Sequence, residues 1–199
     1  AAIGNVGGNI GRLTNTGTIG GSGPGTGYGI DNNGGAIGLI VNSGTISGQG
    51  AVDAAGIALR SAVSTNIINS ASGMIVGSGP GNAYSSGAYG INVQGATVPN
   101  LSNAGTISGT GAGINITGTG AIGNLVNSGV ILGGIRNAGT IATLTNSQSN
   151  LAYSGNLPTN YNTTITSPTN YGKLIVTGPT GATKFGITPG STFGSGTNT

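Results

Sequence analysis

A ten-residue pattern centred on asparagine recurs through the first 150 residues and constrains the fold more than any other feature. All seven copies have an aliphatic residue two positions before the asparagine, and they are centred on Asn15, Asn42, Asn69, Asn103, Asn127, Asn137 and Asn146. Five of the seven also have glycine two positions later and isoleucine four positions later, which gives the consensus I-x-x-L-x-N-x-G-x-I. Asparagine and glycine tolerate the positive φ of tight corners, so each copy predicts a strand, a corner and a second strand.

A segment this short buries a core only when successive copies stack, which is the logic of a solenoid. A second marker is the dipeptide Gly-Ile, which ends at Ile30, Ile57, Ile91 and Ile114. From these isoleucines to the next motif asparagine the distances are 12, 12, 12 and 13 residues. One arc of each coil therefore has a nearly constant length and the other varies. This predicts a parallel β-helix over residues 1–150, with the variable arcs forming loops on one face. The motif asparagines are expected to stack as a structural ladder of hydrogen-bonded amides at the corners, with tight coils at Asn127, Asn137 and Asn146.

The repeat stops near residue 151, and residues 151–199 are rich in tyrosine, phenylalanine, proline and threonine. Both ends of a β-helix expose unpaired backbone edges, so this tail is predicted to be a β-rich cap. The residues expected to form the cap, or to take part in polymerisation, are Tyr161, Tyr171, Leu174, Val176 and Phe185.

The composition argues against several classes of function. Charged residues make up 4% of the chain, histidine and cysteine are absent, and Asp31 and Asp53 are the only acids. Glycosidases need a carboxylate pair, but these two acids occupy different positions in the repeat. We therefore predict no catalytic residue, no metal site and no cofactor. The basic residues are scattered, which disfavours nucleic-acid binding. No apolar run approaches the ~20 residues of a transmembrane helix.

Two long arcs carry tyrosines beside prolines, and the stacking of coils predicts that these arcs lie on one side of the solenoid. Tyrosine presents a flat apolar ring with a polar tip, which suits binding to sugars or partner chains. The candidate binding residues are Pro24, Tyr28, Pro80, Tyr84 and Tyr89. The alternative is that each tyrosine folds back over its own loop.

The repeats Val41–Ile46 and Asn103–Ile107 resemble the β-helix coils in the passenger domains of bacterial autotransporters, the type V secreted proteins. The segment from Leu157 to Ile187 is similar to the part that precedes the membrane barrel in one group of them. The resemblance implies a right-handed β-helix at the surface of a Gram-negative bacterium, with roles in adhesion, aggregation or biofilm formation. This chain lacks the barrel, so either the barrel has been removed or the protein works without one.

We therefore expect a non-enzymatic extracellular scaffold whose partners are copies of itself, surface glycans or other cells. The main alternative is a fibre subunit that polymerises end to end by β-augmentation through the tail. A polysaccharide-cleaving enzyme using Asp31 and Asp53 is a second alternative. An ice-binding solenoid is a third, suggested by Thr18, Thr45, Thr106 and Thr140.

Overall fold

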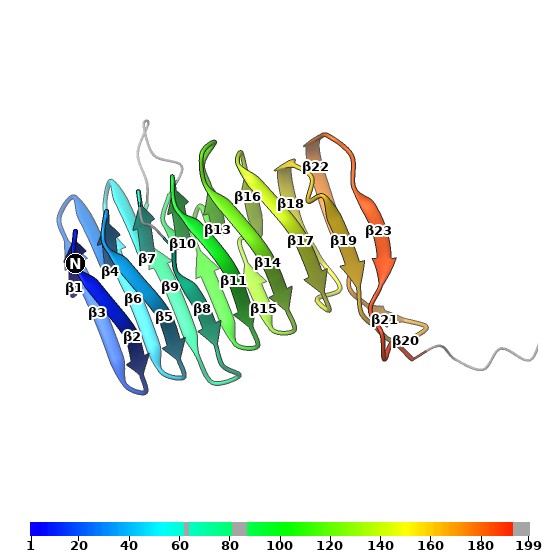
Figure 1. The fold of residues 1–199 in the computed structure, drawn as a ribbon, viewed down its shortest axis with the longest axis horizontal. Coiled ribbons are helices and arrows are strands. Elements are labelled where there is room, and N and C mark those ends of the chain that lie inside the picture. The colour runs from blue at the N-terminus through cyan, green and yellow to red at the C-terminus, as the bar shows by residue number, and fades with distance from the viewer. Residues whose placement is uncertain (62–63, 81–86, 193–199) are drawn as a thin grey trace, which may run out of the picture.

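The computed structural model describes residues 1–61, 64–80 and 87–192, and within these ranges the chain is all-β, without a helix. The strands stack along one axis from the N-terminal coil to the C-terminal coil (Figure 1). The pairing between coils is parallel throughout the three main sheets, which confirms the predicted parallel β-helix.

Three sheets form the sides of the solenoid. Sheet A contains β1 (Ile3–Val6), β4 (Thr26–Asn33), β7 (Asp53–Arg60), β10 (Tyr89–Gln94), β13 (Ala112–Ile116), β16 (Ile135–Asn137), β18 (Leu151–Asn156) and β22 (Leu174–Thr180). Sheet B contains β2 (Asn9–Asn15), β5 (Ala36–Asn42), β8 (Asn66–Asn69), β11 (Thr97–Asn103), β14 (Ala121–Asn127), β17 (Thr140–Asn146), β19 (Asn160–Thr163) and β23 (Lys184–Ile187). Sheet C contains β3 (Thr18–Gly23), β6 (Thr45–Gly50), β9 (Met74–Ser78), β12 (Thr106–Gly109) and β15 (Val130–Leu132).

The core is built from rows of aliphatic residues that stack in register. One row in sheet A is Ile3, Ile30, Ile57, Ile91, Ile114 and Ile135. One row in sheet B is Leu13, Ile40, Ile67, Leu101, Leu125 and Leu144. Ile40, Ile57 and Ile91 are completely buried, so the aliphatic positions of the repeat are the inward positions, as predicted.

Six of the seven motif asparagines form one continuous amide ladder at the corner between sheets B and C. Each Nδ2 donates a hydrogen bond to the Oδ1 of the next member, at distances of 2.8, 2.9, 2.8, 2.8 and 3.0 Å from Asn15 to Asn146. The members are separated by 27, 27, 34, 24 and 19 residues, which are the lengths of successive coils. The repeat therefore tolerates large changes in coil length because this corner stays in register.

Asn137 does not belong to that ladder, so its assignment from the repeat was wrong. It ends β16 of sheet A, where it pairs with Ile116 and Gly155. Its Nδ2 donates to the hydroxyl of Tyr153 at 3.0 Å and to the carbonyl of Asn156 at 2.7 Å. The corners on both sides of sheet B use the same Asn-x-Gly chemistry. Asn127 and Asn146 lie one short coil of 19 residues apart, and Asn137 occupies the other corner between them.

The first two glycine-rich arcs, residues 20–28 and 47–55, are mostly strand, which corrects the prediction of loops there. Residues 81–86 of the longest arc lie outside the described residues. Sheets A and C approach so closely that their backbones touch where the arcs turn back. A Cβ atom on Gly48 of β6 would lie 1.9 Å from the carbonyl oxygen of Ala55, and one on Gly56 of β7 would lie 2.8 Å from Cγ2 of Ile75. Only glycine fits between the two sheets at these rows, because any side chain would collide with the opposite backbone.

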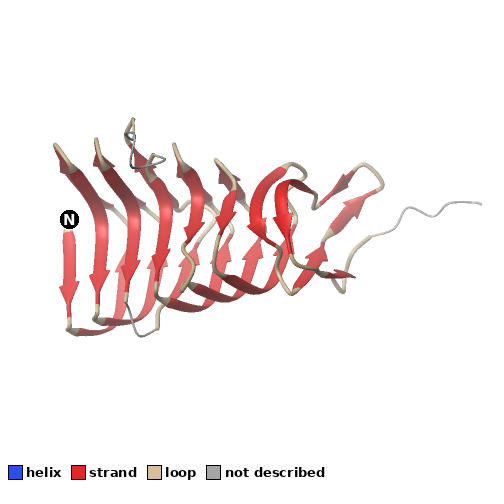
Figure 2. Ribbon diagram, turned by 90° about the horizontal axis from the view of Figure 1, so that it is seen from above, coloured by secondary structure: helices blue, strands red, loops and turns tan. Residues whose placement is uncertain are grey.

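The described part of the tail, residues 151–192, is β-rich as predicted, and it extends the stack of coils past residue 150. β18 and β22 extend sheet A, while β19 and β23 extend sheet B. Sheet C ends at β15, and β20 (Ile165–Ser167) and β21 (Asn170–Tyr171) form a small antiparallel pair in the segment between β19 and β22. Figure 2 shows the stack of strands from above, and Figure 1 labels β18, β19, β22 and β23 at its C-terminal end.

Candidate functional site

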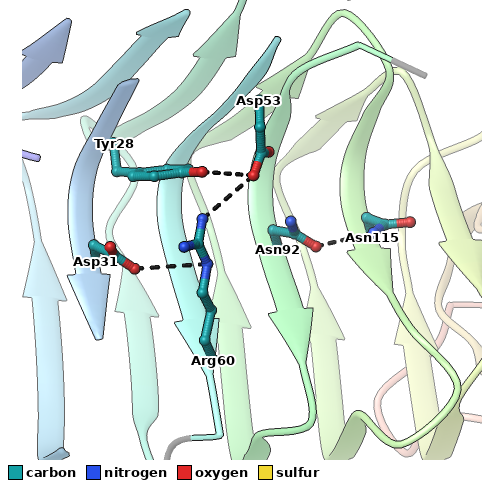
Figure 3. A network of polar contacts seen from close by, with 6 residues as sticks. All are labelled: Tyr28, Asp31, Asp53, Arg60, Asn92 and Asn115. Carbon is teal, nitrogen blue, oxygen red and sulfur yellow. Dashed lines mark hydrogen bonds and ion pairs between the residues drawn. The ribbon is translucent and has the colours of Figure 1, made fainter. Parts of the chain in front are cut away.

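The first candidate site is a charged cluster that ties the second coil to the third. Arg60 lies 3.7 Å from Oδ1 of Asp31 and 3.3 Å from Oδ2 of Asp53, and its guanidinium stands 4.4 Å from the centre of the Tyr28 ring. The Tyr28 hydroxyl donates a 2.5 Å hydrogen bond to Asp53. Figure 3 shows Arg60 reaching from the end of β7 towards both carboxylates and the ring.

This cluster lies on the face of sheet A opposite the core, since Asp31 follows the inward-facing Ile30 and strand side chains alternate. Burial of Tyr28 together with its hydrogen bond to Asp53 raises the pKa of the phenol to about 12. Both acids of the chain thus contact the same arginine. Arg60 therefore forms a structural clasp between Asp31 of the second coil and Asp53 of the third.

The predicted binding residues separate into two places. Pro24 and Pro80 line a pocket of about 490 Å³ at the turns between sheets C and A, with Gln49 and Ala51 between them. Tyr28 and Tyr89 are only 5% and 9% exposed and lie within strands of sheet A, packed with alanines in a second apolar cluster. They offer little ring surface to a partner. Tyr84 lies outside the described residues.

The second candidate site is an apolar pocket of about 420 Å³ at the C-terminal end of the solenoid. The five residues predicted for the cap or for polymerisation all line this pocket: Tyr161, Tyr171, Leu174, Val176 and Phe185. Other residues of the last two coils complete the lining. Burial raises the pKa of the Tyr161 phenol, and its ring lies 6.0 Å from that of Phe185. The structure therefore brings these five residues together.

This end of the described chain leaves apolar side chains and backbone edges uncovered. Phe185 is 67% exposed, and Ile175, Val176 and Ile187 are also exposed. Among the described residues, β22 and β23 pair on one side only. The pocket is thus the open interior of the last coil, which another pair of strands can cover.

The third candidate site is the outer face of sheet B, which the sequence reasoning missed. The amides of Asn66, Asn100 and Asn124 form an exposed ladder, with donor–acceptor distances of 3.0 and 3.2 Å. Beside it, Ile68 and Val126 are 41% and 42% exposed. The signal was present, because each of these asparagines stands three positions before a motif asparagine.

The threonines considered for ice binding do not form a single array. Thr18, Thr45 and Thr106 share a row of sheet C, but Met74 and Val130 occupy the other two positions of that row. Thr140 lies in β17 of sheet B. The row is thus interrupted by apolar side chains.

Comparison of this chain with family models, curated proteins and solved structures finds no significant match. Within the described ranges, no cluster of three or more metal-ligating side chains occurs. The same ranges contain no helix with the length and apolarity required to cross a membrane. The fold and the three surfaces described above are therefore the basis for inferring function.

Proposed function

We propose that this chain is a non-enzymatic extracellular scaffold that mediates adhesion, aggregation or biofilm formation at the surface of a Gram-negative bacterium. The resemblance of its repeats to autotransporter passenger domains suggests the setting. The mechanism is a rod of stacked coils that presents a long lateral face to surface glycans, other cells or copies of itself. Many weak contacts along this face add up to a stable attachment.

The observation that carries the proposal is the outer face of sheet B. Its row of outward side chains begins with Arg12, ends with Lys184 and contains no charge between them: Arg12, Leu39, Asn66, Asn100, Asn124, Thr143, Asn160 and Lys184. Hydrogen-bonding amides beside exposed aliphatic side chains suit contact with an uncharged surface, because desolvation of neutral groups costs less than desolvation of ions. Pairing of both acids with Arg60 supports the absence of hydrolytic chemistry.

The lateral face is tested with two matched charge insertions. Val126 on sheet B and Val52 on the turn before β7 are 42% and 43% exposed, so Val126→Glu and Val52→Glu cause similar loss of exposed apolar surface. Beads coated with the chain are scored for clumping and for retention on bacterial cells and on glycan-coated plates. We expect Val126→Glu to reduce retention severalfold and Val52→Glu to leave it unchanged. Equal retention for the two variants, or no retention of the parent chain, would refute the role of this face.

A second function, an end-to-end fibre subunit, is favoured by the exposed apolar C-terminal end. Covering Phe185, which is 67% exposed, provides a driving force for β-augmentation by a further coil. Negative-stain microscopy of the parent chain, Phe185→Ser and the control Leu132→Ser distinguishes this function from the first, since Leu132 is 51% exposed but lies on the outer face of sheet C. End-to-end particles that persist in Phe185→Ser would contradict it.

A further inference from the structure

The first and last described coils carry the same inward and outward rows, so they can be aligned residue by residue. The inward row of sheet B starts with Leu13 and continues through Leu144 and Tyr161 to Phe185. The inward row of sheet A continues through Ile135 and Tyr153 to Val176. If the first coil of a second copy continues these sheets in register, Leu13 falls on Phe185 and Ile3 falls on Val176.

Each of these side chains has surface to bury in such a contact. Phe185 and Val176 are 67% and 39% exposed, and Ile3 and Leu13 are only partly buried against the core. At the ladder corner, Asn15 of the incoming copy would sit on Ile187. Its amide already donates to Asn42, Gly17 and Thr45, so an isoleucine beneath it breaks no hydrogen bond.

The same register brings two positive charges together. The outward row that starts at Arg12 ends at Lys184, one position before Phe185. Both side chains are exposed. Adjacent strands lie ~4.8 Å apart, so stacking in register places Arg12 of one copy beside Lys184 of the other, and no acidic residue follows Asp53 to neutralise them.

We propose that the C-terminal coil is a docking surface for the first coil of a second copy, and that the Arg12–Lys184 repulsion restrains this contact at low ionic strength. The proposal rests on the end-to-end function suggested above and adds its register and its control. Charged residues on exposed edges are a common means of limiting edge-to-edge pairing. Because Arg12 and Lys184 lie on the same outward row of sheet B, their repulsion makes the end-to-end contact depend on salt concentration.

Two features keep the contact weak and reversible. β22 carries Gly178 with φ of 56° and then Pro179, and its pairing with β18 is irregular at this point. An edge proline has no N–H to offer, so regular pairing is confined to Leu174–Thr177. The interface also falls short of the standard size of about 20–30 residues on each side, since the last coil spans only β22, its turn and β23, from Leu174 to Ile187.

Charge reversal tests the proposal. The chain and the variants Lys184→Glu, Arg12→Glu and Arg12→Glu/Lys184→Glu are compared by sedimentation velocity over a concentration series, at about 10 mM and 300 mM salt, where the Debye lengths are about 30 Å and 6 Å. Arg136→Glu is the matched control. It changes the net charge equally, and Arg136 is exposed, but it lies on β16 in the interior of sheet A, away from both ends and outside the Arg12 row.

At low salt, we expect each single reversal in the row to lower the concentration needed for end-to-end association about five- to tenfold, as expected for turning a repulsion at 5–7 Å into an attraction. High salt should reduce this gain to about twofold or less. The double reversal should return to the parent value, Arg136→Glu should change it less than twofold, and Phe185→Ser should abolish the gain of Lys184→Glu.

The outcomes separate the two ideas. Equal effects of Lys184→Glu and Arg136→Glu would show a net-charge effect and overturn the register and the restraint. Association of the parent chain that is insensitive to all the charge variants would overturn the restraint and leave end-to-end stacking standing. Absence of association for every variant at both salt concentrations would overturn the end-to-end function and this inference together, without affecting the role proposed for the face of sheet B.

Discussion

Two asparagines in β11, three residues apart, allow the buried and exposed amide ladders to be compared by the same substitution. Asn103 is completely buried, donates to Asn127 at 2.8 Å and to the carbonyl of Val130 at 3.3 Å, and accepts from Asn69 at 2.8 Å. Asn100 is exposed, donates to Asn66 at 3.0 Å and accepts from Asn124 at 3.2 Å. We expect Asn103→Ala to destabilise the fold far more than Asn100→Ala.

The magnitude follows from the groups left without partners. Asn103→Ala removes two buried hydrogen bonds and one partly buried one, worth about 1 kcal/mol each, and leaves the Oδ1 of Asn127 without a donor, so we expect a loss of about 3–4 kcal/mol in the free energy of unfolding. After Asn100→Ala, water replaces the lost partners, and the expected loss is about 0.5 kcal/mol. Both residues lie in β11 and the side-chain volume removed is the same, so the difference in destabilisation reports burial.

Urea unfolding followed by far-UV circular dichroism measures both variants. With a slope of about 2 kcal/mol per molar urea, Asn103→Ala should lower the midpoint by about 1.5–2 M and Asn100→Ala by about 0.3 M. Unchanged slopes are needed for the comparison, because repeat proteins can unfold in parts. Equal midpoint shifts for the two variants would refute the idea that the inner ladder holds the coils together.

Three further predictions address other parts of the structure. Gly56→Ala should destabilise the protein by about 3 kcal/mol or more, because the new Cβ would lie 2.8 Å from both the Gly90 carbonyl oxygen and Ile75 Cγ2. In the control Gly11→Ala the new Cβ meets open space, so the melting temperature should not change. Arg60→Met should lower the free energy of unfolding by about 1–3 kcal/mol, because it leaves Asp31 and Asp53 without their cation. The control Arg12→Met loses only an exposed hydrogen bond to Thr14, so it should have little effect on the melting temperature. Burial raises the pKa of Tyr28 and Tyr153 from 10.0 to about 12. The folded state thus favours the neutral phenols. The stability that these two phenols contribute is complete below about pH 10 and is lost as the pH rises from about 10 to 12. A urea midpoint that falls as steeply between pH 10 and 12 in Tyr28→Phe/Tyr153→Phe as in the parent chain would contradict this assignment.

The short spacing of the repeat and its Asn-Gly corners determined the parallel β-helix. Aliphatic residues two positions before each asparagine have to face inward when the units stack, and the structure places Ile40, Ile67 and Leu101 in one buried row. The sequence also identified six members of the ladder, because a buried amide needs a partner and the equivalent amide on the next coil supplies it. The five tail residues that line the C-terminal pocket were predictable from their apolar character in a segment that follows the last repeat.

The tertiary structure alone decided which corner each asparagine occupies and how the glycine-rich arcs close. Asn137 has the same local sequence as the ladder asparagines, but the short coil places it in sheet A, since one local motif serves both corners. The arcs read as loops because glycine has no side chain to reveal an inward face, and their strand structure depends on contact between the backbones of sheets A and C. The contact of Arg60 with Asp31 arises from the cross-coil pairing of β7 with β4, and its contact with Asp53 forms within β7; the spacing of these residues in the chain carries no signal.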